Sequence, residues 1–184
     1  MRPFIACLLA NLFLIFVFSG AVQADLLRER RILAGLDLFP SFLAADRDIA
    51  EKVSDDGSLL LVLVCHGETG KIERMRRNLE KVQIIRGISV RVEITTNLTL
   101  QSFADDAPAG IFLAEPVRSL APLAAFAQRH SRILFSPFDG DVSRGAIGGI
   151  HVSDRILPHI NWKAAAAAGI RFRSFFMRIA KIHE

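Results

Sequence analysis

Cys65 and His66 are sequence neighbours, and a thiol beside an imidazole has the residue types of a nucleophile and its base. Adjacent residues of a strand point to opposite faces, so the two side chains diverge unless the strand ends before them. Cys65 follows six consecutive aliphatic residues, Leu59 to Val64, and a free cysteine in such a run behaves as a small core residue. We therefore expect a buried thiol, and a thiol-dependent enzyme that uses Cys65 is the alternative.

The turn Gly67-Glu68-Thr69-Gly70-Lys71 lies between an expected strand and an expected helix, where phosphate-binding loops occur. A Walker loop has four residues between its first glycine and its Gly-Lys pair, whereas only two separate Gly67 from Gly70. Ile72 stands where the metal-binding hydroxyl is needed, and Glu68 would bring negative charge against a phosphate. We therefore expect an ordinary tight turn here.

Metal ligands and other catalytic motifs are not recognisable in the sequence. Metal-ligand spacing does not connect Cys65 with the remaining histidines, which are His130, His151, His159 and His183. His151 and His159 could face each other across a hairpin, but half-exposed strand positions are the commoner explanation. Asp139 and Asp141 resemble the start of a calcium loop whose other ligands are missing. We expect no metal, no cofactor and no catalytic residue.

Residues 1–24 have the pattern of an export signal. Arg2 supplies the positive start, residues 4–18 form an apolar run interrupted by Asn11, and Val22-Gln23-Ala24 offers small residues where a signal peptidase reads them. The run is short for a bilayer span, and a charged stretch follows at once. We expect cleavage after Ala24 and release into the periplasm, with an uncleaved anchor as the alternative.

The expected mature chain has the size of one domain, since 184 residues less 24 leave 160. Removal of Arg2 lowers the formal net charge from +4 to +3, and this mildly basic, mixed charge does not point to nucleic acid as a partner. Cys7 leaves with the signal, so Cys65 has no internal disulfide partner and could form only an intermolecular disulfide.

Apolar runs and amphipathic segments alternate along the chain, which predicts βαβ units with a mainly parallel sheet flanked by helices. The expected strands span residues 59–65, 88–94, 110–114 and 132–135. The expected helices span residues 26–43 with a bend at Pro40, 46–53, 71–85 and 117–130, the last opening at Pro116.

The end of the chain predicts a different arrangement. Residues 147–152 and 156–160 flank the turn-favouring pair Ser153-Asp154, which indicates an antiparallel hairpin. Asn161 is expected to cap a helix over residues 164–168 that Gly169 terminates. Ser174 is expected to cap a terminal helix that reaches Ile182. The whole predicts one α/β domain over residues 25–184.

The terminal helix and the residues just before it carry four cations close to aromatic residues. The cations are Arg171, Arg173, Arg178 and Lys181, and the aromatic residues are Phe172, Phe175 and Phe176. Such a helix could contact an acidic partner surface or anionic headgroups. Alternatively, its aromatic side packs on the sheet while its cations stay in water. Both hold if the wet face is the binding face.

Residues 147–180 resemble the carboxy-terminal signature of the YfiR-like family of periplasmic regulators. The matching residues are Gly148-Gly149, Arg155, Ile156, Ile160-Asn161, Ala164 to Ala168, Gly169-Ile170 and Ile179-Ala180. Residues 32–42 are similar to the first helix of the family, and residues 59–67 to its first strand and turn. The resemblance implies a protein-binding α/β domain that holds the periplasmic domain of a membrane diguanylate cyclase in check and lowers cyclic-di-GMP signalling and biofilm formation.

The chain departs from the family pattern in two places. Ala44-Ala45 replace the aromatic-proline end of the first helix, and Ala109-Gly110 precede the third strand where several members have one of their paired cysteines. Redox switching through an internal disulfide is therefore not expected. The expected partner is an inner-membrane signalling protein, with a second copy of the chain as a further possibility. An exported solute-binding module is the other alternative, with a pocket near Gly67, residues 95–97 and Ala114-Glu115.

Overall fold

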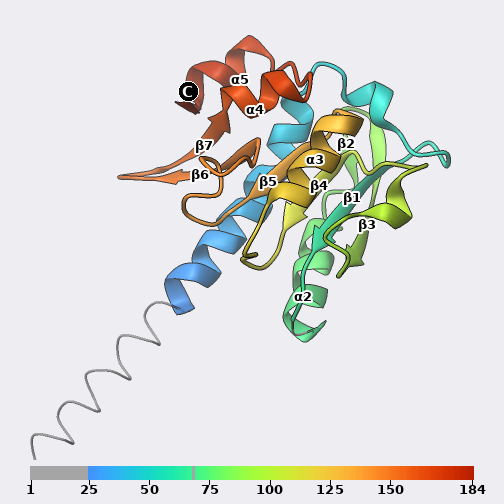
Figure 1. Ribbon diagram of the computed structural model, residues 1–184, viewed down its shortest axis with the longest axis horizontal. Helices are drawn as coiled ribbons and strands as arrows, with labels where there is room; N and C mark the ends of the chain where they lie inside the picture. The colour runs from blue at the N-terminus through green and yellow to red at the C-terminus, as the bar shows by residue number, and fades with distance from the viewer. Residues whose placement is uncertain (1–24, 68) are drawn as a thin grey trace, which may run out of the picture.

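Figure 1 shows the computed structural model, which describes residues 25–67 and 69–184. The expected export signal, residues 1–24, lies outside the described part of the chain. In the described part of the chain, eight strands form one sheet in the order β2-β3-β1-β4-β5-β6-β7-β8. Five of them run parallel, and these are β1 (Leu59–Val64), β3 (Ile88–Thr95), β4 (Gly110–Leu113), β5 (Ile133–Ser136) and β6 (Gly148–Val152).

The remaining strands lie at the two ends of this order. β2 (Ile84–Ile85) is antiparallel to β3, β7 (Ile156–Asn161) is antiparallel to β6, and β8 (Lys181–His183) is parallel to β7. The mainly parallel sheet and its C-terminal hairpin, formed by β6 and β7, are as the sequence predicted. All six residues of β1 are buried, because this strand lies between β3 and β4 and is covered on both faces.

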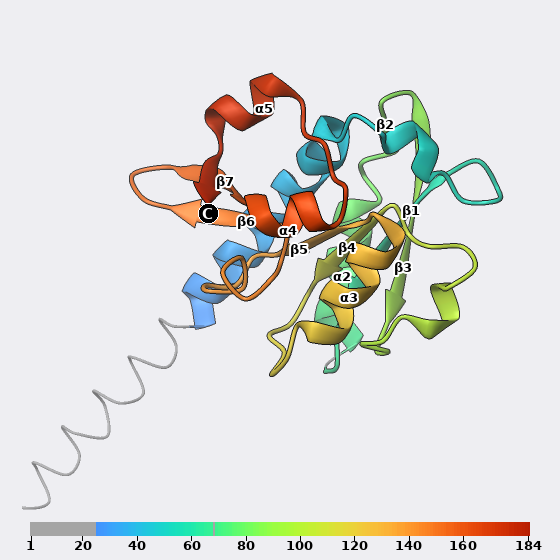
Figure 2. The same cartoon turned by 45° about the horizontal axis from the view of Figure 1, so that its top comes forward.

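Helices cover both faces of the sheet. Residues 25–45 are helical and are called helix 25–45 below; the other α-helices are α2 (Thr69–Leu79), α3 (Ala121–His130), α4 (Trp162–Ala167) and α5 (Ser174–Ile179). Helix 25–45 and α2 lie on one face, and α3 lies on the other (Figures 1 and 2). Within the described residues, none of the helices has the length and apolar character needed to span a membrane.

An aromatic cluster fixes helix 25–45 on the sheet. The Phe39 ring lies 5.5 Å from the rings of both Phe112 and Phe135, and the Phe42 ring lies 5.0 Å from that of Phe135. The close approach requires glycine in β6, because a Cβ on Gly148 would lie 2.6 Å from the Phe42 ring. Packing of this kind, and not local propensity, holds the helix.

The first predicted helix differs from the observed one. The sequence predicted a bend at Pro40, but helix 25–45 continues through it. Proline removes one backbone hydrogen bond, and burial of Phe39 and Phe42 on either side offsets that loss. The helix predicted over residues 46–53 is also wrong, since only the 3-10 turn Ile49–Lys52 forms.

Residues 71–85 are not one helix, because α2 ends at Leu79 and β2 follows. β2 and β3 are joined by Arg86 and Gly87, which have φ values of 55° and 86°. Two successive residues with positive φ form the tight turn whose twist suits a hairpin, and glycine adopts this conformation without strain. β2 therefore forms because this turn brings residues 84–85 back against β3.

Two helix starts were also predicted wrongly. α3 begins at Ala121 and not near Pro116, because the Arg144 guanidinium donates to the carbonyl oxygens of Val117 and Arg118, each at 3.1 Å, and holds them in a loop. Ser174 does not cap α5, since Arg173 occupies the N-cap position without a side-chain hydrogen bond. The same helix ends at Ile179, and β8 replaces its predicted last turn. Asn161 does cap α4, accepting from the Ala164 amide at 2.9 Å.

Candidate functional site

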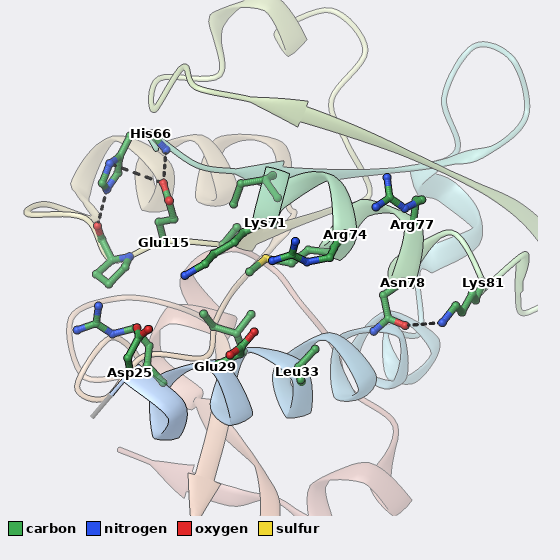
Figure 3. A pocket seen from close by; sticks show the side chains of 16 residues that line it. Asp25, Glu29, Leu33, His66, Lys71, Arg74, Arg77, Asn78, Lys81 and Glu115 are labelled. Atoms are coloured by element: carbon green, nitrogen blue, oxygen red, sulfur yellow. Dashed lines mark hydrogen bonds and ion pairs between the residues drawn. The ribbon is translucent and has the colours of Figure 1, made fainter. Parts of the chain in front are cut away.

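A groove of about 790 Å³ lies between helix 25–45 and α2, beyond the carboxyl ends of β1 and β4 (Figure 3). We call it the α2 groove. Sites for small organic ligands have volumes of roughly 300 to 1,000 Å³, and open α/β sheets bind ligands at this edge. Ala114 and Glu115 line the groove as the solute-binding alternative predicted, whereas residues 95–97 do not.

The floor of the α2 groove is apolar. Ile72 and Ala114 are at most 1% exposed, and Ile32 of helix 25–45 is 7% exposed. Met75 packs against the same core and also lines the groove. An apolar ligand body would therefore rest on side chains that the protein already holds in place.

On one wall of the groove, every charged lining residue is a cation. The charged groove residues of α2 and the segment after it are Lys71, Arg74, Arg77 and Lys81, at intervals that place them on one helix face. Among the described residues, no carboxylate lies within 4.0 Å of Lys71 or Arg74. Glu73, the acidic residue of α2, pairs with Arg76 and Arg77 and not with Lys71 or Arg74: Arg76 Nε donates to its carboxylate at 3.0 Å and lowers the pKa of Glu73, and Arg77 Nη1 lies 3.7 Å from Glu73 Oε1.

Helix 25–45 forms the opposite wall, where charges of both signs occur. Asp25, Arg28 and Glu29 line it, followed by Leu33. Figure 3 shows Glu29 and Leu33 facing α2 across the groove, while Lys71 and Arg74 reach from α2 into the space between. The two walls therefore differ in charge, and the excess of cations lies on α2.

Glu115 closes the inner end of the groove. Its Oε2 accepts a hydrogen bond of 2.6 Å from the His66 backbone amide, and His66 Nε2 lies 2.8 Å from the Pro116 carbonyl oxygen. Gly67 makes room for this carboxylate, since a Cβ there would lie 2.5 Å from Glu115 Oε1. The loop that the sequence placed at a phosphate-loop position thus already holds a carboxylate of the chain itself.

Cys65 lies in the core just behind this loop and is 3% exposed. Its thiol lies 3.8 Å from the Thr95 carbonyl oxygen. Burial raises the pKa of the Cys65 thiol, and the Glu115 carboxylate adds to the rise. The His66 ring contacts Pro116 instead. A reactive thiolate needs exposure and a lowered pKa, so this geometry argues against the thiol-enzyme alternative.

The four cations predicted as a partner surface do not form one cluster. Arg171 donates from Nε to Asp48 Oδ2 at 2.9 Å, and this contact lowers the pKa of Asp48. Arg173 is half-buried, with Nε enclosed and without a hydrogen-bond partner among the described residues. Arg178 and Lys181 are exposed. Of the four cations, Arg171 is exposed but paired with Asp48, Arg173 is half-buried, and Arg178 and Lys181 face solvent without a carboxylate within 4.0 Å among the described residues.

The solvent-facing side of α5 carries apolar residues beside these two cations. Phe175 and Ile179 are both 54% exposed and lie four residues apart, on one face of the helix. Phe176 points the other way, with its ring 4.9 Å from that of Phe42. We call Phe175, Arg178, Ile179 and Lys181 the α5 surface. It adjoins β8, whose outer edge pairs with no strand of the described chain.

A row of histidines crosses the end strands of the sheet. The ring centroids of His151 and His159 are 5.8 Å apart, and those of His159 and His183 are 6.1 Å apart. Because His151 is opposite Leu157 and His183 is opposite Asn161, the three rings lie along a diagonal. The described residues contain no group of three or more ligands that could hold a metal. The sequence predicted that His151 and His159 could face each other, but it did not place His183 beside them, because the three-residue strand that carries His183 has no clear pattern.

Comparison with known proteins gives little similarity. No family model matches the chain, and no curated protein matches it. Among solved structures, the chain is similar to the ABC domain in complex with L-Trp from Streptococcus pneumonia, with 11% sequence identity and a TM-score of 0.47. That alignment covers 77% of this chain and 62% of the other, so the chain spans less than two thirds of that structure.

Proposed function

We propose that the chain is an exported, non-catalytic regulator that binds the periplasmic domain of an inner-membrane signalling protein. The YfiR-like resemblance implies a diguanylate cyclase as the partner and lower cyclic-di-GMP signalling as the result. The observation that carries the proposal is the α5 surface, which exposes Phe175 and Ile179 inside the segment that bears the resemblance.

Such a regulator needs only differential binding. A protein that prefers one state of a two-state partner shifts its equilibrium, by about tenfold for each 1.4 kcal/mol of preference. The α5 surface offers the means for this. Phe175 is the kind of aromatic anchor that dominates binding energy in interfaces, and Arg178 and Lys181 suit an acidic partner surface. The open edge of β8 could also accept a strand of the partner.

The fold does not need the exposed side of α5. Phe176 and Phe172 already pack that helix and its approach against Phe42, with ring centroids 4.9 and 5.9 Å away. Backbone hydrogen bonds of 2.9 Å from Arg47 N to Arg171 O and from Arg173 N to Ala45 O tether the same segment to the end of helix 25–45. Replacement of Phe175 and Ile179 should therefore leave the domain folded and test binding alone.

The test is capture of a membrane protein by the immobilised mature chain. Detergent-solubilised inner membranes of the source organism are passed over the wild-type chain, and bound proteins are identified by mass spectrometry. We expect an integral membrane diguanylate cyclase or sensor protein, at least tenfold depleted by the double variant Phe175→Ser/Ile179→Ser. Ile84→Ser is the matched control, since Ile84 is 64% exposed but lies on β2, at the other end of the sheet.

Two outcomes contradict the proposal in different ways. Recovery of no integral membrane protein by the wild-type chain would contradict the regulatory role itself. Equal recovery of the same membrane protein by wild type and by the α5 double variant would contradict only the assignment of the α5 surface.

A further inference from the structure

We propose that the α2 groove binds an amphipathic monocarboxylate, with the carboxylate at Lys71 and Arg74 and the apolar body on Ile32, Ile72 and Met75. This inference goes beyond the regulatory role, because it concerns a small ligand at a different surface.

The head-group preference follows from the charges that face the groove. Lys71 and Arg74 are exposed, lie three residues apart on α2 and have no carboxylate of the described chain within 4.0 Å. Lys71 also lies in the first turn of an eleven-residue helix, where the helix dipole favours an anion. A carboxylate in the groove would thus gain two charge-assisted hydrogen bonds.

The groove also limits the ligand to one negative charge. Glu115 occupies the inner end, and Asp25 and Glu29 stand on the wall opposite Lys71 and Arg74. A second carboxylate at the far end of the ligand would lie against the apolar floor of Ile32, Ile72 and Met75, where it would lose hydration. Phosphate would also find the amide of the β1–α2 loop taken, because His66 N–H already donates to Glu115. A neutral apolar tail fits this surrounding better than a second charge.

The tail preference follows from the floor. Ile32, Ile72 and Ala114 are held in the core, so an alkyl or aryl body gains burial without ordering new side chains. Each buried CH₂ group of a ligand tightens binding about three- to fourfold. The volume of about 790 Å³ accommodates a medium-length chain with space left for water.

The experiment is calorimetric titration of the mature chain with four matched probes. We expect octanoate to bind, hexanoate to bind about tenfold more weakly, and 1-octanol and octanedioate each to bind at least tenfold more weakly than octanoate. Equal affinity for octanoate and 1-octanol would overturn the assignment of the head group. Equal affinity for octanoate and octanedioate would overturn the limit of one charge.

Variants and a local probe place the ligand. The double variant Lys71→Gln/Arg74→Gln should weaken octanoate binding about tenfold, whereas Arg129→Gln, on an exposed cation of α3, should not change it. The methyl resonance of Met75 should shift on titration and that of Met177 should not. Unchanged octanoate affinity in the double variant, or a shift at Met177 alone, would overturn the site. Thermal unfolding without ligand checks that each variant is folded.

The titration and the membrane capture fail independently. A chain that captures its membrane partner but binds no octanoate loses only the groove assignment, and a chain that binds octanoate but captures no membrane protein loses only the regulatory role.

Discussion

The α2 groove and the α5 surface place similar residue types, apolar side chains beside cations, in opposite shapes. In the groove, the apolar floor lies between two helices, with Ile32 7% exposed and Met75 half-buried. On α5, Phe175 and Ile179 are more than half exposed on a convex helix face. A concave floor removes water from several sides of a small molecule, whereas a convex face excludes water only against a large partner. Shape, and not composition, therefore assigns the two surfaces to different ligands.

The two surfaces also share one support. Helix 25–45 contributes Ile32 and Leu33 to the groove, and its Phe42 packs against Phe176 of α5. A change in this helix should reach both surfaces, while a change in either surface should stay local.

The largest effect is expected from Phe42→Ala. Phe42 is fully buried and its ring contacts the rings of Phe135, Phe172 and Phe176 at centroid distances of 5.0, 5.9 and 4.9 Å. Loss of a buried phenyl ring should lower the free energy of unfolding by about 3 to 5 kcal/mol, measured by urea denaturation. Octanoate binding and membrane capture should both weaken, since both surfaces lose their common support.

The control for this change is Leu26→Ala on the same helix. Leu26 is 52% exposed, so the free energy of unfolding should change by less than about 0.5 kcal/mol. A loss as large as that of Phe42→Ala would show that helix 25–45 is not anchored through the aromatic cluster.

The next effect concerns the buried ion pair of Asp46 and Lys52, whose side chains are 0% and 5% exposed. Asp46→Ala leaves the Lys52 ammonium buried without its partner, which should cost about 3 kcal/mol or more in urea denaturation. Asp46 also forms a backbone bridge with Phe172, so amide exchange should accelerate in α5 before it does around Ile72. Asp46→Ala should therefore loosen the α5 surface while the α2 groove keeps its structure.

Asp48→Ala is the matched control for this pair. Asp48 binds the exposed Arg171, a surface contact that contributes little, so its removal should barely move the urea midpoint. Equal losses from the two substitutions would contradict the assignment of the stabilising role to the buried pair.

Most of the sheet could be predicted because its longer strands and its hairpin have patterns that are local in the sequence. Six aliphatic residues in a row indicated β1, and turn residues marked the β6–β7 hairpin. β2 and β8 were not predictable, since strands of two and three residues carry no periodicity and form only against β3 and β7. The predicted bend at Pro40 has the same explanation, because tertiary packing keeps residues 25–45 helical where local propensity would break the helix.

In the candidate sites too, local features are readable from the sequence, whereas contacts between distant segments are not. The interval between Lys71 and Arg74 is readable from the sequence, but the facing wall comes from helix 25–45, which only folding brings there. Arg171 counted as a free cation in the sequence, and its partner Asp48 lies 123 residues away along the chain. Charges can be counted from a sequence, but their pairing requires the fold.

A smaller effect is expected from pH at the edge of the sheet. Burial lowers the pKa of His159, and the neighbouring His151, His183 and Lys181 lower it further. The unfolded imidazole therefore binds a proton more readily than the folded one. Stability should fall as pH decreases through about 6.5, the ordinary histidine pKa, and the loss should end below the folded pKa.

Thermal unfolding between pH 7.5 and 5.5 tests this prediction with His159→Gln. The variant should lose less stability over this range than wild type, with exchange at β8 amides showing the difference first. Part of the dependence should persist, because burial also lowers the pKa of His130 in α3. An unchanged pH dependence in the variant would contradict a role for the histidine row.

The smallest effect is expected from Glu115→Gln, which changes the charge at the inner end of the groove and little else. Glutamine keeps an oxygen that can accept the His66 amide proton, so the loop after β1 should retain its shape. A unit negative charge in the same groove repels the ligand carboxylate weakly in water, so its removal should tighten octanoate binding by about twofold at most. Affinity for 1-octanol should not change, and neither should membrane capture, because the α5 surface is a separate one. Tighter binding of both octanoate and 1-octanol would mean that the substitution reshapes the groove, and altered membrane capture would mean that the two surfaces act as one.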